Sequence, residues 1–287
     1  MFSTSQHGWW TGSGQDTNNI FVFDGGMSMV GSVSNIAVGE QIYATRFLGT
    51  RAFLVTFQQI DPLFAVDLTN PSNPLILGQL TLSGYSNFLL PYDETHLIGI
   101  GKDVIVAEDH NDGDVPWWNG AAFFQGMKLS LFDVTDLRNP VLLHSVSIGD
   151  RGTDSPALYD PHAILFDHDR NLLAFPVEIA QIQTPDPTQP WLWGDPVFQG
   201  AQVYDVSVAN GFVLRGQVTQ IPSGENIWDH WDKYIDRILF IDSDLFTLSL
   251  SELKVNDFAS LSDKATLALP PGPENGGITV VDPSETP

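Results

Sequence analysis

The sequence predicts an all-β fold, either a β-propeller of about five four-stranded blades or the C-terminal half of a larger propeller. Two patterns predict it. Short apolar runs follow one another along most of the 287 residues, separated by turns that carry Gly, Pro, Asn and Asp, as in a β-meander. An apolar strand that ends on Asp or Asn also recurs, ending at Asp24, Asp67, Asp133, Asp205, Asn256 and Asp282.

The spacing of this Asp-ended strand indicates blades. Asp24 and Asp67 lie 43 residues apart, which is a natural length for one four-stranded blade. The next two spacings are longer because they contain the loop-like stretches 104–126 and 177–199. A β-sandwich also has short strands, but it gives no reason for one strand type to recur at blade spacing.

We expect one propeller domain over residues 1–287, with a partial first blade at 1–35. Further blades are expected near 41–82, 88–149, 157–220 and 231–270, and 277–282 is a candidate closing strand for the first blade. The expected strands are 2–5, 20–24 and 29–33; 41–48, 51–57, 63–67 and 75–81; 88–90, 97–102, 128–133 and 141–148; 157–166, 172–176, 201–205 and 212–219; 234–241, 245–250, 253–256 and 266–269. Runs such as 51–57 are apolar on both alternating faces, so each sheet must be covered on both sides.

Composition excludes several classes of partner and chemistry. The 12 Lys and Arg residues face 35 Asp and Glu residues, for a net charge of −23, so we expect no nucleic-acid or anionic-membrane partner. The absence of cysteine excludes disulfides, a thiol nucleophile and thiolate metal ligands. We expect no membrane insertion, because no stretch is long and apolar enough. The first residues also lack the features of a signal peptide.

The long connections are expected at one end of the sheets. In an antiparallel meander the connections alternate between the two ends, and every long insertion falls in a connection of the same parity. All eight tryptophans occur there as close pairs: Trp9 and Trp10, Trp117 and Trp118, Trp191 and Trp193, Trp228 and Trp231. Such rings could stack on sugars or anchor a protein partner. The alternative is that they pin the long loops onto the blades.

The run 108–114 on the same face is rich in oxygen ligands. Asp109, Asn111, Asp112 and Asp114 could supply them to Ca²⁺, which prefers carboxylate and amide oxygens. The run fails as an EF-hand because Asp114 stands where Gly is required. A solvated turn is the alternative, and we expect no cofactor other than this calcium ion.

Other charged residues indicate a functional site less specifically. Arg151, flanked by Asp150 and Asp154, could orient a substrate or could tie down its own loop through charge-assisted hydrogen bonds. His162 is expected in a strand and His168 in a turn at the opposite end, so the two histidines should not share a metal. No nucleophile elbow, zinc helix or phosphate loop occurs, and the sequence singles out no carboxylate pair for glycoside hydrolysis.

Several stretches, including RFLGTRAFLVTFQQIDPLFAVDL, MKLSLFDVTD and GAQVYDVSVANGF, resemble the uncharacterised secreted β-propeller family of archaea and bacteria that is distantly related to WD40-type repeats. The resemblance covers nearly the whole chain and matches the C-terminal half of family members. It implies an extracellular or cell-surface location, and it supplies no catalytic residues. One departure is Pro161–His162, where the family pattern has His followed by Lys.

The sequence leaves three functions open. The first is an extracellular binding or scaffolding module that presents the Trp-rich face to a carbohydrate or protein. The second is a calcium-assisted polysaccharide hydrolase or lyase, although an enzyme is the less favoured class. The third is a self-assembling surface protein, because half a ring would leave its terminal blades uncovered and a homo-oligomer would cover them.

Overall fold

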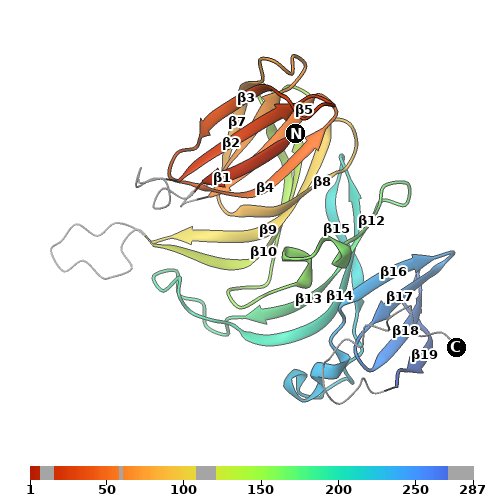
Figure 1. The fold of residues 1–287 in the computed structure, drawn as a ribbon. Helices are drawn as coiled ribbons and strands as arrows, with labels where there is room; N and C mark the ends of the chain where they lie inside the picture. The colour runs from red at the N-terminus through yellow and green to blue at the C-terminus, as the bar shows by residue number, and fades with distance from the viewer. Residues whose placement is uncertain (7–15, 58–60, 108–120, 271–287) are drawn as a thin grey trace, which may run out of the picture.

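The computed structural model describes residues 1–6, 16–57, 61–107 and 121–270. Five antiparallel sheets follow one another around an arc, with the first sheet and the fifth at its opposite ends (Figure 1). Four sheets have four strands and the first has three. In every sheet, strands that are consecutive in sequence are neighbours, so the predicted all-β meander is confirmed.

The strands of the first three sheets are β1 Phe2–Gln6, β2 Thr17–Phe23 and β3 Met29–Ile36; β4 Gln41–Leu48, β5 Arg51–Phe57, β6 Asp61–Asp67 and β7 Leu75–Leu82; β8 Tyr85–Pro91, β9 His96–Val106, β10 Ala122–Asp133 and β11 Val141–Ile148. Those of the last two are β12 Leu165–Asp167, β13 Leu172–Gln181, β14 Asp195–Ser207 and β15 Gly211–Val218; β16 Arg237–Ile241, β17 Asp244–Leu248, β18 Glu252–Asp257 and β19 Asp263–Ala268. The candidate closing strand 277–282 lies outside the described residues.

The expected strand 157–166 is wrong over most of its length. The segment forms two short 3-10 helices, η1 Pro156–Leu158 and η2 Pro161–Ala163, and only β12 is extended. Each helix starts with a proline whose fixed φ suits a first helical position. Ser155 and Asp160 cap them by accepting hydrogen bonds from the backbone N–H of Ala157 and His162. Local capping therefore overrides the apolar pattern here.

Apolar side chains fill the space between each pair of consecutive sheets. In β5, Ala52 and Leu54 pack against the first sheet, and Phe53 and Val55 pack against the third. Two further clusters join the third sheet to the fourth and the fourth to the fifth. Both faces of a central strand are therefore buried, as its sequence predicts.

The recurring aspartate organises a turn at the end of its strand. The Asp67 and Asp133 carboxylates each accept a hydrogen bond of 2.8 Å from the backbone N–H two residues later, at Thr69 and Thr135. Hydrogen bonds from the hydroxyls of the same two threonines lower the pKa of both aspartates most, and those from the backbone N–H groups lower it further. Asp205 instead pairs with Arg215. The motif thus marks where the third strand of a blade turns back.

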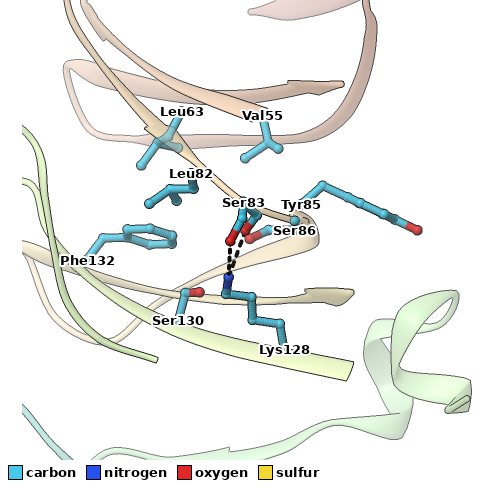
Figure 2. A pocket seen from close by; sticks show the side chains of 10 residues that line it. Val55, Leu63, Leu82, Ser83, Tyr85, Ser86, Lys128, Ser130 and Phe132 are labelled. Carbon is cyan, nitrogen blue, oxygen red and sulfur yellow. Dashed lines mark hydrogen bonds between the residues drawn. The ribbon is translucent and has the colours of Figure 1, made fainter. Parts of the chain in front are cut away.

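Figure 2 shows how closely the second and third sheets pack. Phe132 faces Leu63 and Leu82, while Lys128 Nζ donates a 2.7 Å hydrogen bond to the Ser83 carbonyl. The gap among these residues has a volume of about 10 Å³, which is about the space that one water needs. This interface is therefore a packed core and has no room for a ligand.

The fifth sheet differs on its two faces. Ile238 and Leu245 are buried against the fourth sheet. The strand register places Leu239, Ile241 and Leu267 on the other face, where all three are exposed. The apolar pattern of the interior sheets therefore continues at this end of the arc.

Replacing Phe132 with Ala should destabilise the fold by about 3–5 kcal/mol, the usual cost of removing a buried phenylalanine ring. Its side chain is 1% exposed between two sheets. Val213→Ala, at an exposed position of β15, should cost about 0.5 kcal/mol or less. Urea denaturation of the two variants measures this, and equal losses would contradict the packing described here.

Candidate functional site

The long connections emerge from one end of the sheets, as the strand parity predicts. Among the described residues these are 149–164 between β11 and β12, 182–194 between β13 and β14, and 219–236 between β15 and β16. We call this end the loop face. The opposite end carries short turns such as 49–50 and 92–95.

Two adjoining hollows lie among these connections, and Asp154 and Tyr159 line both. The first, which we call the arginine hollow, has a volume of about 370 Å³ and is also lined by Lys102, Phe124, Gln125, Arg151, Gly152 and Trp193. The second, which we call the carboxylate hollow, has a volume of about 350 Å³ and is also lined by Ser155, Glu178, Gln199, Tyr234 and Asp236. Each is large enough for a small ligand.

The wall between the hollows is fixed to the fourth sheet. Asp154 and Glu178 exchange two backbone hydrogen bonds of 2.8 and 2.9 Å. The Thr153 hydroxyl accepts a hydrogen bond from the Ala180 N–H at 3.0 Å. Gly152 has a φ of 108°, a conformation that favours glycine, and a Cβ there would lie 3.3 Å from the Trp193 ring. The connection 149–154 is thus held against β13 by the isolated bridge at Asp154 and by the Asp150 N–H, which donates a 2.8 Å hydrogen bond to the Ala180 carbonyl.

Arg151 reaches across the arginine hollow instead of bonding to its neighbours in sequence. Its Nη1 donates a 3.0 Å hydrogen bond to the Phe124 carbonyl, and its guanidinium stacks 4.7 Å from the Trp193 ring centroid. The Asp150 carboxylate accepts a hydrogen bond from the Ile182 N–H, and that of Asp154 lies 3.3 Å from Lys102 Nζ. Neither flanking carboxylate therefore ties Arg151 to its own loop.

Three of the four described tryptophans are exposed on the loop face. Trp193, Trp228 and Trp231 are 69%, 61% and 66% exposed, whereas Trp191 is half-buried with its ring against Phe123. Trp228 and Trp231 belong to a 3-10 segment, η3 Ile227–Lys233. Only Trp193 lines one of the two hollows. The structure therefore separates these residues, which sequence reasoning treats alike.

The remaining predicted site residues lie outside the described residues: Trp9, Trp10, Trp117, Trp118, Asp109, Asn111, Asp112 and Asp114. Their roles in ligand or calcium binding stay predictions. Within the described ranges, no group of three or more acidic or histidine side chains is arranged to hold a metal ion.

The two histidines do not share a site. His162 lies in η2, not in the expected strand, and its Nδ1 is 2.8 Å from the Asp160 carboxylate. His168 lies in the turn between β12 and β13 and packs against the Tyr92 ring.

The carboxylate hollow brings together acids that the sequence does not single out. Burial, followed by the negative charge of Asp154, raises the pKa of Glu178. Burial and the neighbouring Glu178 carboxylate raise the pKa of Tyr234 to about 12. The Tyr234 hydroxyl is buried there without a well-aligned hydrogen bond to any described residue. Burial also raises the pKa of Asp236. The only sequence signal for Glu178 is a lone charge in the apolar strand LLAFPVEIAQ.

Residues 2–261 match the family described as the beta propeller domain. The chain belongs to this beta propeller domain family. Together with the five radially placed sheets, the match confirms the predicted fold class. The domain is 31% identical over 241 residues to an uncharacterised protein of Methanocaldococcus jannaschii, covering 84% of this chain and 30% of that protein. An uncharacterised protein of Archaeoglobus fulgidus is 34% identical over 161 residues, covering 56% and 22%. The chain thus spans less than a third of either relative.

Solved propellers are similar at low sequence identity. Apo AztD from Citrobacter koseri has a TM-score of 0.42 at 13% identity, with 90% of this chain and 57% of that chain covered. The Neurospora crassa Pan2 WD40 domain has a TM-score of 0.45 at 7% identity, with 90% and 63% covered. Chaetomium thermophilum Sqt1, bound to the N-terminus of the ribosomal protein L10, has a TM-score of 0.40 at 12% identity, with 88% and 68% covered. No helix in the described ranges of our beta propeller domain could cross a membrane.

Glu178→Gln should stabilise the domain at neutral pH and have less effect in acid. The folded state binds the Glu178 proton more tightly than the unfolded state, because its pKa is raised. Stability is therefore lost as the pH rises through the ordinary carboxyl range toward the folded pKa, and glutamine removes that loss. Urea midpoints at about pH 4 and pH 7 measure the difference. The exposed Glu94→Gln is the matched control, and a gain for Glu178→Gln that is larger in acid would contradict the burial of this carboxyl.

Proposed function

We propose that this beta propeller domain is an extracellular binding module that takes a carbohydrate on its loop face. The observation that supports it is the exposed indole of Trp193, held by the Arg151 guanidinium at the edge of the arginine hollow. A flat, rigid ring offers a large apolar area at little conformational cost. The apolar face of a sugar ring can lie on it.

The hollows suit the polar side of such a ligand. Carboxylates of Asp154, Glu178 and Asp236 accept hydrogen bonds, and the hydroxyl of the exposed Tyr159, which donates to Asp154, can accept one. A sugar presents several hydroxyl groups of both kinds. Concave sites with a few fixed polar groups suit small ligands, whereas a protein partner usually needs a broader surface. The geometry therefore favours a glycan over a protein.

The proposal includes the setting of the domain. The family resemblance supports export and a place in the C-terminal half of a larger propeller. The acidic, lysine-poor composition suits a surface exposed to the medium. Trp228 and Trp231, exposed on the same face, would extend the contact with a long glycan.

Trp193→Ala should weaken glycan binding about 30-fold, since removing a tryptophan that anchors a ligand typically costs about 2 kcal/mol or more. Trp193→Tyr should retain most of the affinity because the ring remains. A glycan array followed by calorimetry on the best-binding oligosaccharide measures both.

Leu75→Ala, at an exposed position of β7, is the matched control and should bind like the parent. Unchanged melting temperatures would show that the fold is intact. Full glycan binding by a folded Trp193→Ala variant would exclude this surface, and binding only to a protein would favour the scaffolding alternative.

A further inference from the structure

Arg151 differs from the other described arginines that stack on an aromatic ring. Arg170 lies over Phe240 and pairs with Asp167 at 2.6 Å. Arg215 lies over Phe258 and pairs with Asp205. Arg151 stacks on Trp193 and on Phe123, but no carboxylate among the described residues pairs with it. Of the acidic residues that the structure describes, none supplies a counter-charge to this cation.

The donors of this guanidinium are only partly used. Nη1 bonds to the Phe124 carbonyl, while Nε is buried and has no acceptor among the described residues. Burial also lowers the pKa of Arg151, because the charged form is poorly hydrated. A partly buried cation that lacks a counter-charge among the described residues is stabilised when an anion arrives.

The neighbouring charges leave room for that anion. Lys102 Nζ donates to the Thr153 carbonyl at 2.9 Å and lies 3.3 Å from the Asp154 carboxylate. The Asp154 charge is thus balanced by Lys102 on the wall of the arginine hollow. The hollow itself, with a volume of about 370 Å³, contains both basic side chains and the Trp193 ring.

We infer that Arg151 binds the carboxylate of an acidic sugar, a uronic acid whose ring lies against Trp193. This inference rests on the proposed function and names its ligand class. The planar guanidinium fork matches a carboxylate, and its stacking on the indole fixes the orientation in which the carboxylate must approach. Trp193 then recognises the ring and Arg151 recognises its charge.

The adjoining carboxylate hollow restricts the next sugar unit. Glu178 and Asp236 line it together with Asp154, which Lys102 balances, and like charges brought together disfavour binding. A second uronate should therefore be rejected there, whereas a neutral sugar can hydrogen-bond to the same carboxylates. The preferred glycan alternates acidic and neutral units.

The test uses the full chain and oligosaccharides in which glucuronate alternates with N-acetylglucosamine, as the free acid and as the methyl ester. The ester keeps the sugar and removes only the charge. Calorimetry should show the acid binding about tenfold or more tightly than the ester. Arg151→Gln should bind acid and ester alike, and Arg151→Lys should keep part of the preference. Arg170→Gln, which removes a stacked but ion-paired arginine, should behave like the parent.

Results other than those expected overturn a stated part of the inference or of the proposed function. Equal binding of acid and ester by the parent, or a preference that survives in folded Arg151→Gln, overturns the inference and leaves the proposed function standing. If the protein binds no glycan, acidic or neutral, both the inference and the proposed function are wrong. Tighter Arg151-dependent binding of a sulfated glycan would assign a sulfate ester in place of the carboxylate. Equal affinity for a polymer of uronate alone would overturn the alternation.

Discussion

Burial of both faces of each interior sheet is the constraint on which the rest of the structure depends. Strands such as β5 carry apolar side chains on both sides, so an isolated sheet would expose a large apolar area. Placing each interior sheet between two neighbours removes that area from water. Strand pairing within a sheet and packing between sheets then fix the positions at which the described connections begin and end.

This rigid stack explains why the candidate site can be built from connections. The segment 149–154 is paired to β13 through Asp154 and Glu178, so Arg151 projects from a fixed backbone. Trp193 comes from the neighbouring connection, and the Gly194 N–H donates a 2.7 Å hydrogen bond to the Arg151 carbonyl. Stacking of the two side chains therefore follows from backbone contacts of the fourth sheet.

The sequence predicts the fold well because its signals are local and repeated. Asp67 and Asp133 mark equivalent turns, and alternating apolar residues mark the strands. The segment 156–164 is misread because Pro156 and Pro161 start capped helices that a strand pattern does not reveal. The carboxylate hollow could not be predicted, because Glu178 lies in β13 and Tyr234 in the connection 219–236, and the two meet only through tertiary packing.

The contacts of Arg151 also could not be predicted from the sequence. Its neighbours Asp150 and Asp154 suggest an ion pair within the loop, but the Ile182 N–H and Lys102 engage them instead. Which of these contacts forms depends on residues distant in sequence. That none of the described carboxylates pairs with Arg151 is therefore visible only in the folded chain.

The exposed Leu239, Ile241 and Leu267 on the fifth sheet also affect the order in which the sheets unfold. An interior sheet has two apolar interfaces, whereas the described residues give the fifth sheet one, against the fourth. In a linear array whose units contact only their neighbours, stability is a sum of nearest-neighbour terms. Among the described sheets, the fifth can therefore open while the interface between the third and the fourth stays intact, so amide protons of β16–β19 exchange with solvent before those of β9, β10 and β13.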